Sequence, residues 1–123
     1  MSKALIVDDE VKVRNIYKKL LNLETYDVIE ASNGEEAGLM LIQNTDIDLV
    51  LLDIRMPVVN GAVLFDLIKL HNPGAKVVVT SAYPMDDQRR VIAGADGYHD
   101  KSEGSQALLS RIRQLLPASG KRV

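Results

Sequence analysis

The chain has 123 residues, 46% of them hydrophobic and 26% charged, which is the composition of one globular domain. The absence of cysteine excludes disulfides, thiolate zinc sites and cysteine nucleophiles, and it fits a reducing cytoplasm. A formal net charge of -2 and 4% aromatic residues argue against a nucleic-acid surface, and no apolar run is long enough for a membrane span. We therefore expect a cytoplasmic domain over residues 1–117, followed by a flexible tail or linker stub over 118–123.

Short apolar runs of strand length alternate with segments of helical spacing. The predicted strands cover residues 4–7, 28–31, 49–52, 77–79 and, more weakly, 97–101. The third and fourth runs are apolar throughout, which is typical of central strands in a parallel sheet that is covered on both faces.

Apolar residues spaced i, i+3, i+4 and i+7 predict four helices between these strands. They lie around residues 13–21, 37–41, 64–68 and 108–116. A more polar segment, 86–94, predicts a fifth and exposed helix. Asn33 with Glu36 resembles a helix start, residues 72–74 read Asn-Pro-Gly and predict a turn, and Pro117 ends the last helix.

Strands that alternate with helices imply βαβ units and a parallel sheet. Five such strands with five helices fit the flavodoxin-like, doubly wound α/β fold with strand order 2-1-3-4-5. Ligands bind to such sheets beyond the carboxyl ends of the strands, at the switch point between the first and third strands. The residues that end each strand are therefore the candidates for function.

Charged and hydroxyl residues stand at these strand ends. The first predicted strand leads into Asp8, Asp9 and Glu10, the third into Asp53, the fourth into Thr80 and Ser81, and the fifth into Lys101. Converging carboxylates repel one another unless a divalent cation is present, and an all-oxygen donor set suits Mg²⁺. A lysine amine and a serine hydroxyl can contact phosphoryl oxygens, so the pattern predicts a site for phosphoryl transfer.

The order and spacing of these motifs resemble the receiver domain of two-component response regulators over nearly the whole chain. The matching segments are residues 5–10, 51–57, 60–61, 81–83 and 94–98, followed by Lys101. By this resemblance Asp53 would accept the phosphoryl group. Asp9 would bind Mg²⁺ directly, Asp8 would support the ion mainly through water, and Arg55 would offer its backbone carbonyl.

The resemblance also implies the parts of a switch. Ser81 would hydrogen-bond the phosphoryl group, Lys101 would pair with Asp53 or its phosphate, and Tyr98 would move inward as Ser81 is drawn toward the phosphate. Ser81 is preferred over Thr80 because successive strand residues face opposite sides, and because a small residue follows Ser81, as in the family.

The function that this implies is a phosphorylation-dependent signalling switch. A histidine kinase or a histidine phosphotransfer protein would donate the phosphoryl group, and the domain would hydrolyse it with Mg²⁺, so it is a regulatory domain and not an enzyme with a separate substrate. No basic recognition helix follows Pro117, so we expect no nucleic-acid contact through this domain. Residues 86–94, 97–101 and 105–116 would form the output face toward an unknown partner and the candidate surface for a phosphorylation-dependent homodimer.

Two alternatives belong to other classes of protein. A Mg²⁺-dependent phosphatase that forms an aspartyl phosphate usually needs a second acid, but Arg55 stands two positions after Asp53. A flavin- or nucleotide-binding module of the same fold needs a loop rich in Ser, Thr or Gly after the first strand. The acidic residues 8–10 would instead repel phosphate unless a metal intervened.

The chain departs from the family after Lys101, where Ser102 replaces the usual proline and its cis bond. A cis bond before a non-proline residue costs ~2.5–4 kcal/mol, so we expect a trans Lys101–Ser102 bond. The sequence does not determine whether Lys101 then still reaches the acidic residues. The polar residues His99 and Asp100 predict an edge strand with one solvent-facing side. His71 and His99 are expected to be surface residues and not metal ligands.

Overall fold

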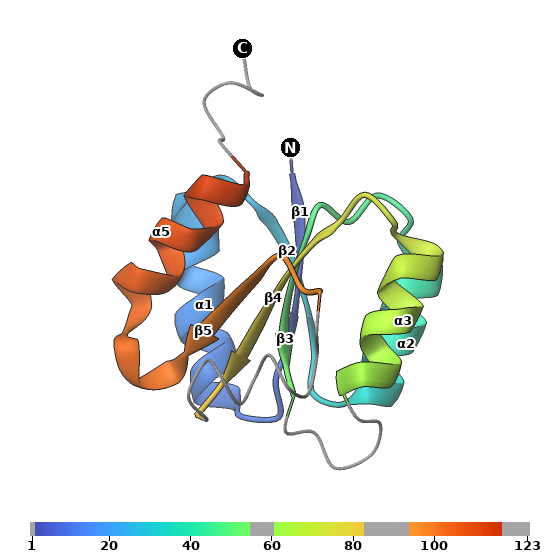
Figure 1. Ribbon diagram of the computed structural model, residues 1–123, viewed down its shortest axis with the longest axis horizontal. Coiled ribbons are helices and arrows are strands. Elements are labelled where there is room, and N and C mark those ends of the chain that lie inside the picture. The colour runs from blue at the N-terminus through green and yellow to red at the C-terminus, as the bar shows by residue number, and fades with distance from the viewer. Residues whose placement is uncertain (1, 55–60, 83–93, 117–123) are drawn as a thin grey trace.

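The computed structural model of the chain describes residues 2–54, 61–82 and 94–116 (Figure 1). Its strands are β1 Lys3–Val7, β2 Asp27–Ala31, β3 Leu49–Asp53, β4 Lys76–Ser81 and β5 Gly97–Asp100. Its helices are α1 Val11–Leu23, α2 Gly34–Gln43, α3 Gly61–His71 and α5 Ser105–Leu115, with a short 3₁₀ turn, η1, over Lys101–Glu103. Arg55, the predicted tail over 118–123 and all of the predicted helix over 86–94 except Gly94 lie outside the described residues.

The five strands form one parallel sheet in the order β2-β1-β3-β4-β5, which confirms the predicted α/β topology. Several strands extend beyond the predicted apolar runs, because backbone pairing continues where the side chains turn polar. Asp53 still pairs with Thr80, and Ser81 with Asp100. The register therefore brings the polar ends of β3, β4 and β5 to the same edge of the sheet.

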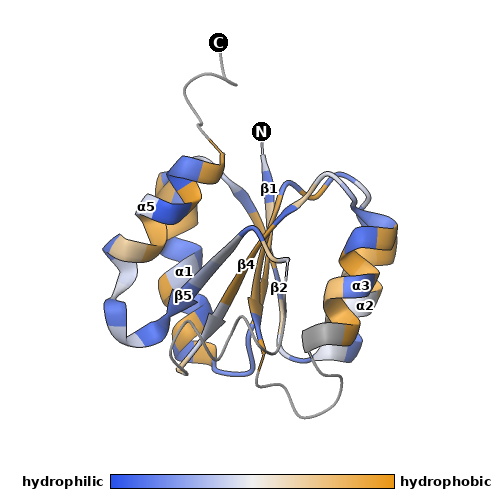
Figure 2. Cartoon of the chain, in the orientation of Figure 1, coloured by the Kyte–Doolittle hydropathy of each residue, from blue (hydrophilic) through white to orange (hydrophobic). Residues whose placement is uncertain are grey.

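Helices cover both faces of the sheet, α1 and α5 on one and α2 and α3 on the other (Figure 1). Alternate residues of β3 pack into two separate cores: Val50 and Leu52 lie with α2 and α3, and Leu49 and Leu51 lie with α1 and α5. All of β3 is buried, as the apolar run over residues 49–52 predicted, and the burial includes the charged Asp53 at its end. The apolar colour of the central strands and of one side of each helix follows this arrangement (Figure 2).

Local polar contacts begin and end the elements where the sequence indicated. The Asn33 side chain accepts a hydrogen bond from the Glu36 amide at 2.8 Å, and Glu36 accepts bonds from the Ser32 amide and hydroxyl at 2.7 Å each. This reciprocal cap confirms the predicted start of α2. At the predicted turn after α3, the Ala75 amide donates to the Asn72 carbonyl at 3.0 Å. In the described part of the chain, every helix falls short of what a membrane span requires in length and apolar content.

β5 is an edge strand as predicted, but the expectation that one of its sides faces solvent is wrong. Tyr98 and His99 point to opposite faces, and both are buried. His99 is only 1% exposed, which corrects its prediction as a surface residue, because it lies on the face that α1 and α5 cover. His71 is half-buried. The Lys101–Ser102 bond is trans, as expected.

Candidate functional site

Acidic side chains gather beyond the carboxyl ends of β1 and β3. Asp8 and Asp53 are 1% and 2% exposed, whereas Asp9 and Glu10 are exposed. One carboxylate oxygen from each of Asp8, Asp9 and Glu10 lies within 4.8 Å of the others. A cavity of about 340 Å³ opens beside them and is lined by Asp9, Glu10, Asp53, Ala82 and Lys101. The structure thus brings the predicted strand-end residues into one site.

Backbone hydrogen bonds shape the turn that carries these acids. The Asp8 amide donates to the Ala31 carbonyl at 3.1 Å, which extends the pairing of β1 with β2. The Asp8 side chain then accepts a bond from the Glu10 amide at 2.9 Å. This local bond is typical of aspartate in turns, and it directs the chain from the strand into α1.

Lys101 reaches into the acidic cluster from the end of β5. Its Nζ lies 2.9 Å from Asp8 Oδ2, 3.4 Å from Asp53 Oδ2 and 3.6 Å from Glu10 Oε1. Burial lowers the pKa of the Lys101 ammonium, but the contact with Asp8 and the charge of Asp53 raise it more, so this pKa lies above its usual value. The ammonium therefore stays charged and offsets part of the repulsion among the four carboxylates around it.

A hydrogen-bonded turn holds the chain after Lys101, at the position where the resemblance implied a proline. The Asp100 side chain accepts bonds from the Ser102 amide at 2.9 Å and from the Ser102 hydroxyl at 2.7 Å. Glu103 accepts a bond from the Asp100 amide at 3.3 Å, which completes a capping box around η1. Arg111 of α5 lies 3.4 Å from the same Glu103 carboxylate. With a trans bond in this loop, Lys101 still reaches both Asp8 and Asp53.

The alternation along β4 separates the two candidate hydroxyls. Val79 packs in the same core as Tyr98, so Ser81, two residues further on, lies on the face of Tyr98. Thr80 lies on the opposite face and pairs with Asp53 in the sheet register. Ser81 and Tyr98 are both buried, and Ala82 after Ser81 lines the cavity. The shared face supports a pairing of Ser81 with Tyr98, and their roles stay predictions.

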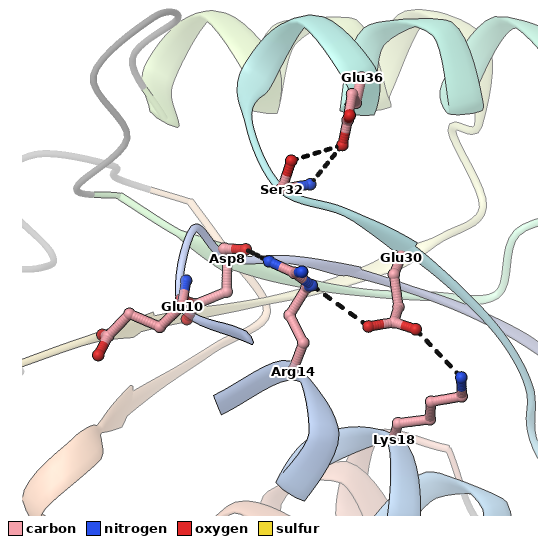
Figure 3. A network of polar contacts seen from close by, with 7 residues as sticks. All are labelled: Asp8, Glu10, Arg14, Lys18, Glu30, Ser32 and Glu36. Atoms are coloured by element: carbon pink, nitrogen blue, oxygen red, sulfur yellow. Dashed lines mark hydrogen bonds and ion pairs between the residues drawn. The ribbon is translucent and has the colours of Figure 1, made fainter. Parts of the chain in front are cut away.

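The sequence placed Glu10 at a strand end without giving it a role, and it did not single out Arg14 or Tyr17. Glu10 lines the cavity and approaches Lys101, and Arg14 donates from Nη1 to the Asp8 carbonyl at 2.7 Å (Figure 3). Burial raises the pKa of the Tyr17 hydroxyl to about 12; Lys101 offsets part of this rise, and the nearby carboxylates add to it. Residues 10, 14 and 17 follow the i, i+4, i+7 spacing of one helix face, so this signal was present in the sequence.

The donors at this edge fit a hard divalent cation. The cluster offers only carboxylate oxygens, and the exposed Asp9 and Glu10 face an open cavity with room for the waters that Mg²⁺ retains. Lys101 supplies one positive charge against four carboxylates, so a net negative charge is left for a cation to neutralise. Arg55, whose carbonyl was predicted as a ligand, lies outside the described residues.

Comparisons with known proteins agree with this geometry. The family model described as "Response regulator receiver domain" matches residues 4–113. The transcriptional regulatory protein CpxR of Escherichia coli (strain K12) is 36% identical over 120 residues, which cover 97% of this chain and 51% of that protein. The chain thus spans about half the length of the CpxR relatives that it matches.

Two further comparisons cover both partners almost completely. The chemotaxis protein CheY of Halobacterium salinarum is 32% identical over 118 residues, which cover 94% of this chain and 98% of that protein. The crystal structure of the response regulator TrrA from Thermotoga maritima, in complex with Mg(2+)-BeF, superposes with a TM-score of 0.83 at 34% identity. That superposition covers 94% of this chain and 100% of TrrA. From the matched family model, the relatives and the fold, the chain belongs to the receiver domains of response regulators in two-component signalling.

Proposed function

We propose that the chain is a phosphorylation-dependent switch that takes a phosphoryl group on Asp53 from a histidine kinase or a histidine phosphotransfer protein. The observation that carries the proposal is the position of Lys101, whose ammonium lies between the buried carboxylates of Asp8 and Asp53 at the wall of an acidic cavity. Asp53 is 2% exposed and still lines that cavity, so it is oriented toward an incoming group and shielded from bulk water.

In the transfer, one carboxylate oxygen of Asp53 attacks the phosphorus of the donor. The new oxygen–phosphorus bond forms as the nitrogen–phosphorus bond of a phosphohistidine breaks, and the imidazole leaves with the electron pair and takes up a proton. In hydrolysis, water attacks the phosphorus, the bond to Asp53 breaks, and inorganic phosphate leaves. Lys101 would pair with the phosphoryl oxygens in both steps, because its ammonium already faces Asp53.

Asp9, Asp8, Asp53 and the Arg55 carbonyl would hold Mg²⁺, with Asp9 as a direct ligand and Asp8 acting mainly through water. Bound Mg²⁺ would neutralise charge on the carboxylates and on the phosphoryl oxygens. The exposure of Asp9 at the cavity and the burial of Asp8 against Lys101 support this division of roles.

The readout would pass through Ser81 and Tyr98 to the surface of β5 and α5, where an output partner or a second copy would bind. The common face of Ser81 and Tyr98 supports this route. Tyr98 is already buried in this structure, so the structure corresponds to the inward position of its side chain. The proposed movement would start from a conformation in which Tyr98 is more exposed. The proposal includes action in the cytoplasm, which the absence of cysteine suits.

The test is incubation with Mg²⁺ and a small-molecule acyl phosphate, followed by intact-mass measurement. The wild-type chain should gain the mass of one phosphoryl group only when Mg²⁺ is present. Asp53→Asn should keep the fold and gain nothing, because a near-isosteric amide cannot form an acyl phosphate. A phosphoryl group on Asp53→Asn would show that another residue is the acceptor.

A further inference from the structure

We infer that Arg14 is a positioning residue, which holds the backbone of the acidic turn (Asp8, Asp9 and Glu10) in the geometry that binds a divalent cation. The inference rests on the proposed function and extends it to a residue outside the carboxylate and lysine set. Arg14 is the fourth residue of α1, and its side chain lies beneath the acidic turn (Figure 3).

The Arg14 side chain binds the acidic turn at the Asp8 carbonyl, to which its guanidinium Nη1 donates at 2.7 Å. The Glu10 carbonyl accepts the first backbone hydrogen bond of α1, from the Arg14 amide at 3.1 Å, which any non-proline residue at this position would make. The guanidinium therefore restrains the side of the turn before Asp9, and the helix restrains the side after it. Because the Asp9 side chain is exposed, its position depends mainly on the backbone that Arg14 restrains.

Glu30 of β2 anchors the guanidinium from the other side. Arg14 Nε donates to Glu30 Oε1 at 3.2 Å, and Lys18 Nζ lies 3.2 Å from Glu30 Oε2 (Figure 3). Glu30 pairs with Ile6 in the sheet register, so β2 holds it directly beside β1. The planar fork of Arg14 thus connects the acidic turn to the sheet, and its side chain is only 14% exposed.

The charge and the hydrogen bonds of Arg14 act on cation binding in opposite directions. A positive charge beside the turn repels a cation, so loss of charge alone would strengthen binding. Loss of the restraint on the turn would weaken binding, since ligands held by their supporting partners bind a metal more tightly. The ion pair with Glu30 offsets much of the Arg14 charge, so we expect the restraint to dominate.

The experiment measures Mg²⁺ binding by calorimetry without any phosphodonor in Arg14→Gln, with Lys18→Gln as the matched control. Lys18→Gln removes the same charge from the same partner, Glu30, but Lys18 leaves the acidic turn untouched. Arg14→Gln should raise the Mg²⁺ Kd roughly tenfold, at the lower end of the effect of supporting residues. Lys18→Gln should change it by no more than about twofold.

Two further measurements separate positioning from charge and from folding. Arg14→Lys keeps the charge without the fork and should also weaken Mg²⁺ binding, and it replaces Arg14→Gln if that variant does not fold. In metal-free buffer, the amides of Asp9 and Glu10 should exchange hydrogen faster in both Arg14 variants than in wild type. A Mg²⁺ Kd for both Arg14 variants equal to or below the Lys18→Gln value overturns the inference. If the wild type neither binds Mg²⁺ nor gains a phosphoryl group, the proposed function fails. The role of Arg14 is then judged on metal-free hydrogen exchange alone, and exchange rates of the Asp9 and Glu10 amides equal to those of wild type would contradict it.

Discussion

Replacement of Lys101 by Met removes the ammonium that lies between two buried carboxylates. Asp8 and Asp53 would then face each other across the site without this positive charge, and both would stay almost fully buried. Burial of an uncompensated charge is strongly unfavourable, so we expect Lys101→Met to destabilise the metal-free protein. Methionine has a similar length and no charge, so the change removes little apolar packing from the side-chain stem.

The distances set the size of the effect. At an effective dielectric constant of about 20, separations of 2.9 and 3.4 Å correspond to attractions of about 6 and 5 kcal/mol. Desolvation of the three groups opposes these attractions, and removal of one partner from a buried pair typically costs about 3–5 kcal/mol. Lys101 is 18% exposed, so we expect the free energy of unfolding to fall by about 3 kcal/mol and Tm to fall by on the order of 10 °C.

Alkaline pH should remove this difference. The folded-state pKa of Lys101 lies above its usual value, so the stabilisation from its charge is complete below about pH 10.5. It is lost as the pH rises through the folded-state pKa. The gap between wild type and Lys101→Met should therefore be constant near neutral pH and should narrow in strongly alkaline buffer.

The assay is urea unfolding at pH 7, once with a chelator and once with Mg²⁺. A cation bound to the native state adds about 2.7 kcal/mol at 100 times its Kd. Mg²⁺ should stabilise Lys101→Met more than wild type, because it replaces the missing charge. Lys18→Met, which breaks an exposed pair with Glu30, should cost less than ~1 kcal/mol. The reasoning is refuted if Lys101→Met in chelator unfolds within about 0.5 kcal/mol of wild type.

Three further predictions concern other buried or acidic groups. In chelator, Asp9→Asn should raise Tm because it removes one negative charge from a cluster of carboxylates that repel one another. Asp8→Asn should lower Tm because Asp8 pairs with Lys101. Melting curves that give the reverse order would contradict the site geometry. Burial lowers the pKa of His99, so the folded protein holds this side chain neutral. The free energy of unfolding should therefore show no loss from His99 above about pH 6.5 and should decrease below that pH, where the unfolded chain takes up the proton first. Urea unfolding from pH 5 to 7 should show a shallower fall for His99→Leu, and equal slopes would exclude this role. Asn72→Ala should cost on the order of 3 kcal/mol by denaturant unfolding, because the buried Asn72 side chain bonds two backbone groups of other segments; a loss below ~1 kcal/mol would mean that water replaces those bonds.

The sequence by itself determined the fold class and the place of the site. Short apolar runs such as residues 49–52, alternating with helical segments, indicated central strands of a parallel sheet, and parallel connections bring all carboxyl ends to one side of the sheet. The positions of Asp8, Asp53 and Lys101 at three strand ends therefore predicted their meeting, which the structure shows at 2.9 and 3.4 Å. The trans bond after Lys101 followed equally from local chemistry, because the cost of a cis bond is a property of the peptide itself.

Only the tertiary structure decided what depends on neighbours from distant segments. His99 looked solvent-facing because local polarity carries no information on what covers an edge strand, and the α1 and α5 face buries it. The restraint of the acidic turn by Arg14 required β2 to place Glu30 beside α1. The reach of Lys101 without a proline depended on the capping box around η1. Such contacts arise from packing between elements, and the periodicity within one element cannot specify them.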